Sequence, residues 1–332
     1  MGSEMCIRDS HLMLPTLSRA LKRLDLPVIA APLPTISTPR LVVAQCKAGI
    51  VGSLSALNAR SCSELDEWLV EIAEELGAWT SEHSGQHAAP FAVKQVIHAN
   101  NRRLYDDMEV LLKHKVPIVI TSQGLSTDAN DAVHAYGGMT LHEVINNGLA
   151  RNAIDKGSDG LIALAAGAGG NAGIKSPFAL IQEIRQWFLG PLVLSGAIST
   201  GAAILAARVA GADFAYIGSA FIATDEARAS TDYKQAIISG SSDDVVYTSF
   251  FNGVRGNYLA QSVTAAGFDP DNLPEHGDTR FDFGCAPGSD SACSEAWPAG
   301  QGIGAVDRVR STRDLIEKLS WEYHEARMRV LI

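Results

Sequence analysis

Two glycine-containing turns in the second half of the chain could bind a phosphate group. One is Ser195-Gly196-Ala197 and the other is Gly218-Ser219, and each ends a short apolar run. Glycine lets the backbone approach a ligand closely, and backbone N–H groups together with the N-terminus of a following helix bind anions. The same glycines could instead form tight turns only. Two such turns after two successive apolar runs favour the phosphate site.

A third glycine-rich segment, AAGAGGNAG, begins at Ala165 and contains Gly170 and Asn171. Four glycines within seven positions would let the backbone lie against a flat ring. The segment loosely matches the dinucleotide-binding pattern GxGxxG/A. We reject that interpretation, because the segment follows a late strand and the next helix starts only near Pro177.

The elements that must position these turns alternate between apolar runs and helical patterns. The apolar runs predict eight strands, at 27–31, 50–53, 91–97, 116–122, 139–144, 159–166, 191–197 and 214–219. Continuous apolar strands are typical of parallel sheets covered on both faces. Eight strand–helix units predict a (β/α)8 TIM barrel of the α/β class, with an open Rossmann-like sheet as the alternative. In a TIM barrel the ligands bind at the C-terminal ends of the strands, and a phosphate follows the last two strands.

Boundary residues mark the helices between the strands. One helix opens at Thr38-Pro39 and ends at Gly49, and a second follows Ser61 and Glu64, which have capping-box spacing, and ends at Gly77. Further helices are predicted at 100–114, 146–156, 177–188, 201–210 and, near the C-terminus, 311–330.

The predicted organisation has four parts. Residues 1–10 are a non-native leader, 11–240 form the barrel, 241–304 form a cap inserted after the eighth strand, and 305–332 form a C-terminal helix packed on the barrel. The cap assignment follows from the irregular order of Gly, Pro, Asp and aromatic residues in 241–300.

Composition limits the class of protein. Hydrophobic residues make up 46% of the chain and charged residues 19%, as in ordinary globular proteins, and the formal net charge of −10 disfavours nucleic acid or anionic membrane as partners. No apolar run is long enough to span a bilayer. The five cysteines lack CxxC spacing and the nine histidines lack HxH or HExxH spacing, so we expect no disulfide framework, no metal site and a cytoplasmic location.

Several motifs in a fixed order resemble the nitronate monooxygenase family, formerly called 2-nitropropane dioxygenases. They are Ala30-Ala31-Pro32, DGLIALAAGAGGNAG, PLVLSGAISTG, GADFAYIGSAFIATDEA and WPAGQGIG, and they extend from about Leu26 to Gly304. The resemblance implies an FMN-dependent enzyme that uses O2 to oxidise alkyl nitronates, or nitroalkanes, to a carbonyl compound and nitrite.

The same resemblance implies roles for individual residues. Ala31 and Pro32 would border the flavin ring, and Gln301 would approach it from the cap. The phosphate would be held by Gly196, Ala197, Gly218 and Ser219, and Gly170 and Ser195 are assigned with the cofactor-binding residues. A homo-oligomer is compatible with the sequence.

Asn171 is the main departure from the family pattern, because relatives usually have histidine there, assigned as the base or as a substrate-orienting group. Asparagine can hydrogen-bond a nitro oxygen but cannot accept a proton near neutral pH. A positioned base contributes about 10²–10⁴-fold. The hypothesis is that the enzyme acts on pre-formed nitronates and poorly on neutral nitroalkanes.

Lys94 and Glu143 also depart from the family, in which asparagine is frequent at the first position and lysine occurs at the second. Lys94 could place a cation near the flavin N1–C2 carbonyl and stabilise the reduced ring. The alternative is a Lys94–Glu143 ion pair without an electronic role. His142 is a poor substitute base, because strand alternation turns it away from Glu143.

Two other functions remain open on the sequence. The chain could be an FMN-dependent, NAD(P)H-using reductase of the enoyl-thioester type, since those enzymes resemble the same barrel. It could also be a flavin-binding protein with weak catalysis.

Overall fold

The computed structural model describes residues 20–83, 85–251, 253–273 and 296–330, so the predicted leader lies outside the described residues. Eight parallel strands form one sheet in the order β1-β9-β8-β6-β5-β4-β3-β2. Their bounds are β1 Val28–Ala30, β2 Gly52–Ser55, β3 Phe91–Val96, β4 Ile118–Ser122, β5 Met139–Val144, β6 Gly160–Leu164, β8 Leu192–Ser195 and β9 Phe214–Ile217.

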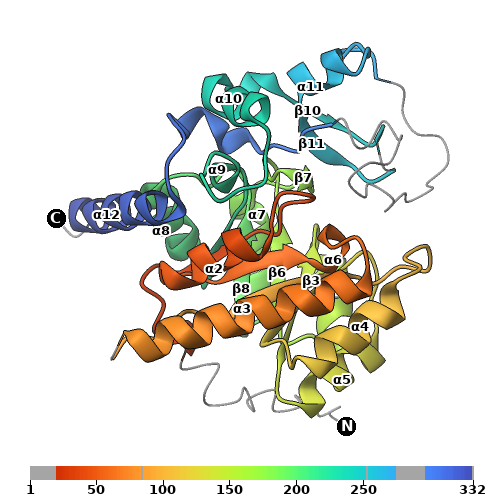
Figure 1. Cartoon of the computed structure of the whole chain (residues 1–332). Coiled ribbons are helices and arrows are strands. Elements are labelled where there is room, and N and C mark those ends of the chain that lie inside the picture. Colours follow the sequence, from red (N-terminus) through yellow and green to blue (C-terminus); the bar gives the residue numbers. More distant parts are fainter. Residues whose placement is uncertain (1–19, 84, 252, 274–295, 331–332) are drawn as a thin grey trace, which may run out of the picture.

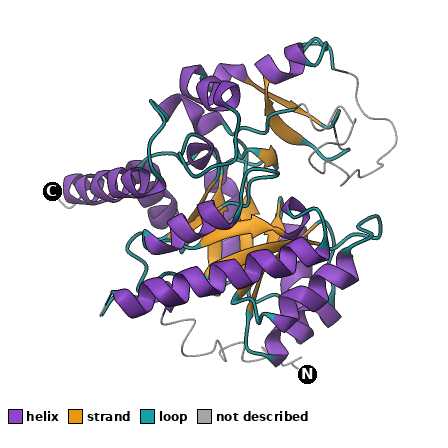
Figure 2. Ribbon diagram, in the orientation of Figure 1, coloured by secondary structure: helices purple, strands orange, loops and turns teal. Residues whose placement is uncertain are grey.

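The two ends of this sheet meet and close it into a barrel. Ile29 of β1 pairs with Val51 just before β2, and the Ala30 N–H donates to the Val51 carbonyl at 2.8 Å. All eight predicted strands are present within a few residues of their predicted bounds. The predicted (β/α)8 barrel is therefore confirmed, and the open sheet is excluded (Figures 1 and 2).

Strand alternation divides the core between the barrel interior and the helical layer. Ile29, Ile120, Leu141 and Ile162 belong to the cluster that fills the interior. Their neighbours along the strands, such as Ala163, pack outward against the helices. Both faces are apolar, which explains why the strands appear in the sequence as continuous apolar runs.

The helices of the barrel cover its outer face (Figure 2). Their bounds are α2 Pro39–Lys47, α3 Cys62–Glu82, α4 Leu104–Lys113, α5 Thr127–Ala135, α6 Asn147–Asp155, α7 Pro177–Arg185, α8 Gly201–Ala210 and the short α9 Ser219–Ile222. α5 was not predicted, because it buries only Asn130 and Val133 and so has a weak apolar pattern.

The predicted end of α3 at Gly77 is wrong, because the helix continues to Glu82. Gly77 lies in open space, where a glycine costs about 1 kcal/mol without breaking a helix. Ser61 accepts the Glu64 N–H at 3.1 Å, whereas the Glu64 carboxylate accepts the N–H of Arg60 instead of Ser61. The capping box is thus only half formed.

Above one end of the barrel lies a smaller unit, the cap (Figure 1). Besides α10 Thr231–Ser239, which precedes the predicted start of the cap at residue 241, it contains β10 Val245–Thr248, β11 Gly256–Leu259 and α11 Ala260–Ala265. β7, formed by Gly170–Asn171, pairs with β11, which also pairs with β10. The three strands form one antiparallel sheet with β11 in the middle. The irregular order of residue types in this part of the chain therefore did not predict the strands and the helix that form there, and 274–295 lie outside the described residues.

α12, formed by Thr312–Val330, packs against α8. The Glu322 carboxylate of α12 accepts the Gly201 N–H at 2.8 Å, and Thr200 accepts the Ala203 N–H at 3.2 Å. The N-terminus of α8 is thus capped by the chain itself. Within the described residues, no helix combines the length and apolar character that crossing a bilayer requires.

Candidate active site

Lys94, Glu143 and Tyr216 meet inside the barrel near the C-terminal ends of β3, β5 and β9. Lys94 Nζ lies 2.6 Å from Glu143 Oε2, and the Tyr216 hydroxyl donates to Glu143 Oε1 at 3.3 Å. Burial raises the pKa of Tyr216 well above its usual range, and the Glu143 charge adds to this effect. The structure therefore shows the ion pair that was one of the two interpretations of Lys94 and Glu143.

Ser122 ends β4, the strand between β3 and β5. It follows the alternation of Ile120, which points into the barrel. Its hydroxyl is buried and has no hydrogen-bond partner among the described residues. A buried hydroxyl without a partner is costly, so this position is suited to a ligand that completes the hydrogen bond.

Glycines from three loops pack against one another above the strands. A Cβ atom on Gly196 would lie 2.7 Å from the Ala166 carbonyl, and one on Gly300 would lie 2.6 Å from the Gly167 carbonyl. Gly302 would likewise meet the Ser199 hydroxyl at 2.6 Å. Part of the glycine content in these motifs thus serves close packing between loops, a role that neither the phosphate site nor the tight-turn alternative included.

The predicted phosphate turns lie side by side at the ends of β8 and β9. Ala197 has a left-handed backbone with φ of 53°, is exposed, and donates its N–H to the Gly167 carbonyl at 3.2 Å. The Ser219 hydroxyl accepts the Gly300 N–H at 2.8 Å. A Cβ on Gly218 would make only ordinary contacts, with Ala31 and Leu33 at 3.4 Å.

One part of the predicted anion site is wrong. The N-terminus of α8 was expected to bind the phosphate, yet the Glu322 carboxylate already accepts the Gly201 N–H. The Gly201 N–H is therefore not free to bind an anion.

Asn171 and Gln301 both lie where the cap meets the barrel. Asn171 is in β7, paired with Gly256 of β11, and is partly buried. Gln301 begins η4, the short helix Gln301–Ala305, and its N–H donates to the Gly167 carbonyl at 3.0 Å. Its side chain is exposed and would lie 3.0 Å from a Cβ placed on Gly167.

Cap residues hold the glycine-rich loop after β6 in place. Asn257 of β11 is buried and donates its side-chain amide to the Ala168 carbonyl at 2.6 Å. The Tyr247 hydroxyl donates to the Ala172 carbonyl at 2.9 Å. The segment before Gln301 is held by Tyr233, which stacks on Trp297 at 4.8 Å between ring centroids. The cap thus fixes both segments that carry Asn171 and Gln301.

The other site residues keep their strand positions. Ala31 and Pro32 directly follow β1 and are partly buried, Ser195 ends β8 and is 7% exposed, and Gly170 has a left-handed backbone with φ of 63°. His142 faces the outside of the barrel, where its Nδ1 lies 2.7 Å from the Thr121 hydroxyl.

Tyr216, Ser122 and Asn257 were not identified from the sequence. Tyr216 lies two residues before Gly218, and Ser122 lies two residues after Ile120, so strand alternation could have placed both inside the barrel. No comparable signal marks Asn257, because its partner lies in a loop 89 positions away.

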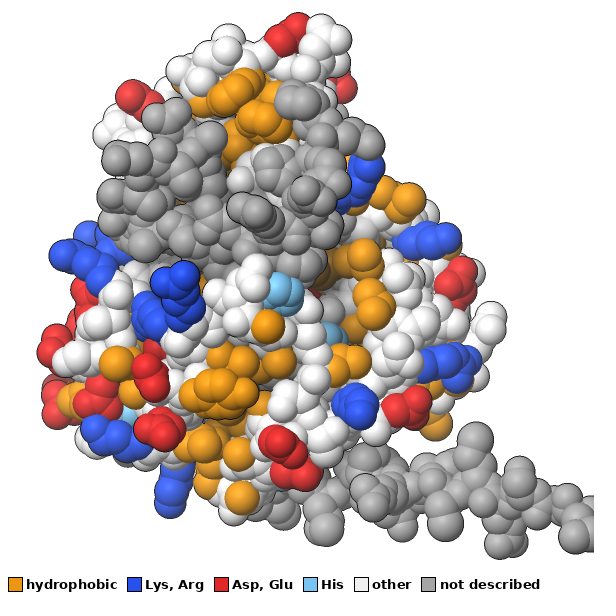
Figure 3. Space-filling view, turned by 90° about the vertical axis from the view of Figure 1, so that its right-hand side faces the viewer, with side chains coloured by type: hydrophobic (Ala, Val, Ile, Leu, Met, Phe, Trp, Pro, Cys, Tyr) orange, Lys and Arg blue, Asp and Glu red, His pale blue; other side chains and the backbone are white. Residues whose placement is uncertain are grey.

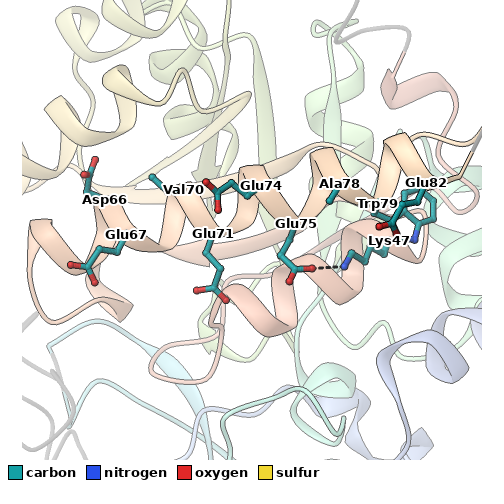
Figure 4. A pocket seen from close by; sticks show the side chains of 10 residues that line it. All are labelled: Lys47, Asp66, Glu67, Val70, Glu71, Glu74, Glu75, Ala78, Trp79 and Glu82. Atoms are coloured by element: carbon teal, nitrogen blue, oxygen red, sulfur yellow. Dashed lines mark hydrogen bonds and ion pairs between the residues drawn. The ribbon is translucent and has the colours of Figure 1, made fainter.

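A surface groove along α3 lies away from the barrel mouth. Figure 4 shows Lys47 of α2 reaching Glu75 at 2.6 Å in this groove. Its lining residues are Lys47, Asp66, Glu67, Val70, Glu71, Glu74, Glu75, Ala78, Trp79 and Glu82. It is an exposed, mostly acidic helix face and contains none of the candidate active-site residues.

Two further features are the distribution of charged side chains on one face of the molecule and the grouping of possible metal ligands among the described residues. On the face drawn in Figure 3, acidic and basic side chains of the described residues are interspersed and form no broad basic patch. Among the described residues, no three His, Cys, Asp or Glu side chains are grouped as metal ligands.

Comparison with known proteins gives a consistent family. The family model for nitronate monooxygenase matches residues 16–322. A nitronate monooxygenase of Paraburkholderia phytofirmans is 27% identical over 281 residues, which cover 74% of this chain and 77% of that protein. A probable nitronate monooxygenase of Staphylococcus aureus is 22% identical over 270 residues, or 69% and 74% of the two chains.

Solved structures show the same fold. A nitroalkane oxidase from Streptomyces ansochromogenes superposes with a TM-score of 0.76 at 22% identity, covering 93% of this chain and 99% of that one. FabK from Thermotoga maritima gives a TM-score of 0.75 at 22% identity, covering 96% and 99%. With the family model matching most of its length, this chain belongs to the nitronate monooxygenase family, a family of flavin-dependent oxidoreductases.

Proposed function

We propose that this protein binds FMN at the mouth of the barrel and oxidises alkyl nitronates with O2 to a carbonyl compound and nitrite. The proposal is carried by one observation: the loops after β6, β8 and β9 and the segment around Gln301 converge there. They interlock through Gly167, Gly300 and Ser219. These are the segments that carry the family motifs.

The residues at the mouth fit FMN. The Ser122 hydroxyl is buried without a partner among the described residues, and Lys94 on the neighbouring strand β3 also points into the interior, so both could donate to ring carbonyl oxygens. At Gly170 and Gly218 an added Cβ would make only ordinary van der Waals contacts, at 3.4 Å or more, so close packing against other loops does not require glycine there. Gly196, Gly218 and Ser219 would hold the phosphate, and Ala31 and Pro32 would border the ring.

When bound, FMN supplies the redox chemistry, and the protein orients the substrate. Asn171 donates a hydrogen bond to a nitronate oxygen, and Gln301 closes the site from the cap side. Neither side chain can remove a proton near neutral pH. His142 faces the outside of the barrel, and its bond to Thr121 keeps it there. The substrate must therefore arrive already deprotonated.

Spectroscopy tests the activity. Propionate 3-nitronate is added to the purified yellow protein without oxygen, and the flavin absorption near its visible maximum is followed. We expect rapid bleaching, with return of the absorption on admission of air. Bleaching by NADH or NADPH but not by a panel of nitronates would favour the enoyl-thioester-type reductase instead, and no bleaching by either would favour a flavin-binding protein.

Replacing Asn171 tests the missing base. Asn171→His should raise kcat/KM for neutral nitroethane by about 100-fold, because a positioned base contributes about 10²–10⁴-fold. It should change kcat/KM for ethyl nitronate only slightly. Equal rates of the wild type on the neutral and anionic forms would contradict the assignment.

A further inference from the structure

Glu143 occupies an unusual place for a carboxylate, in the interior of the barrel between opposite walls. β3 and β5 are separated by one strand, and β5 and β9 by two strands, β6 and β8. Glu143 reaches Lys94 on one side at 2.6 Å and Tyr216 on the other at 3.3 Å. The interior around it is apolar and includes Ile120 and Leu164.

Exposure shows which member of this group faces a ligand. The Lys94 side chain is 16% exposed, whereas the Glu143 side chain is only 6% exposed. Tyr216 is buried as well. Of the two charged side chains, Lys94 therefore offers more surface to a ligand at the mouth.

Both Glu143 oxygens are already engaged by protein donors. One accepts from Lys94 and the other from Tyr216. With only 6% of its side chain exposed, Glu143 has little surface for a substrate, so its influence on a ligand passes through Lys94. In an apolar interior, opposite charges at this distance are screened little and largely cancel each other's field at a nearby ligand.

We propose that Glu143 is a positioning residue that holds Lys94 at the floor of the site and offsets its charge, and thereby keeps the reduction potential of the bound flavin low. This inference rests on the proposed function, because it requires FMN at the barrel mouth. Without the carboxylate, the Lys94 charge is uncompensated. A cation near the ring favours its reduced, anionic form.

The test measures the flavin potential of the holoenzyme against a reference dye. Glu143→Gln removes the charge and keeps a similar shape with hydrogen-bonding capacity. We expect at least a tenfold shift of the equilibrium toward reduced flavin, which is ~30 mV for a two-electron couple. The double variant Glu143→Gln/Lys94→Met, which removes both charges, should return to within about threefold of the wild type. A merely structural role for Glu143 would not be reversed in this way.

Two further variants complete the test, one as a control and one as a second test of Glu143. Glu75→Gln breaks the exposed Lys47–Glu75 pair, which has the same 2.6 Å separation but lies on α3, and should leave the potential unchanged. Tyr216→Phe removes one donor to Glu143, so the charge of the carboxylate is less offset by hydrogen bonding and acts more strongly on Lys94 and the ring. It should shift the equilibrium slightly toward oxidised flavin, and it replaces Glu143→Gln as the test if that variant does not retain FMN.

The outcomes separate this inference from the proposed function. If the wild type binds FMN and neither Glu143→Gln nor Tyr216→Phe alters its potential, the inference is wrong and the proposed function stands. If the wild type takes up no FMN, the proposed function itself is wrong.

Discussion

At the scale of single residues, burial and strand alternation decide which polar groups can do chemistry. His142 and Glu143 are neighbours in β5, yet they have opposite environments. His142 contacts Thr121 on the outer face, and Glu143 contacts Lys94 in the interior. The sequence allowed both the ion pair and the orientation of His142 to be anticipated. It did not reveal Tyr216 as a third member, because that contact depends on how the barrel closes.

His142 should make stability depend on pH. Burial lowers its pKa to about 4, and the nearby Lys94 charge adds to this effect. In the unfolded chain the pKa is about 6.5, so between these values the unfolded state binds more protons, and stability is lost as the pH falls. The free energy of unfolding should drop by about 2 kcal/mol from this group between pH 7 and pH 5.

Urea unfolding of the wild type and of His142→Gln at both pH values measures this contribution as a difference. The variant should lose less stability than the wild type on acidification. An identical loss in both proteins would show that His142 does not titrate as its burial requires.

At the scale of elements, backbone conformation at the turn after β8 gives a matched pair of substitutions. Gly196 has φ of 137°, and a Cβ there would lie 2.7 Å from the Ala166 carbonyl. Gly196→Ala should therefore destabilise the protein by about 2 kcal/mol and weaken FMN binding. Ala197 already has a left-handed φ of 53°, so Ala197→Gly should be neutral or stabilising by up to about 1 kcal/mol.

Chemical denaturation of both variants, with FMN titration of each, decides this prediction. Equal effects of the two substitutions would mean that neither the positive φ of Gly196 nor its close approach to the Ala166 carbonyl limits the residue at this position.

The sequence predicted the barrel elements well, because their signals are local. Each strand is an apolar run, and α8 was predicted with its observed bounds, 201–210. Elements stabilised by distant partners were not predicted. β7 has only two residues and exists because β11 pairs with it, although the two strands are more than 80 positions apart. Similarly, the N-terminus of α8 was assigned to a phosphate because the sequence does not show that Glu322 of α12 reaches it.

At the scale of the whole molecule, the barrel and the cap build the site together. The barrel supplies Lys94, Ser122 and the turns after β8 and β9, and the cap fixes the segments that carry Asn171 and Gln301. Asn257 and Tyr247 connect the two parts through the loop after β6. The family motifs, which are far apart in the sequence, thus lie in loops that meet at the barrel mouth.

The central claim is that this mouth binds FMN. The most direct measurement is the identity and amount of flavin released on denaturing the purified protein, followed by titration of the stripped protein with FMN. We expect a yellow protein that releases one FMN per chain and binds FMN again on reconstitution. A colourless protein that takes up no FMN on reconstitution would contradict it.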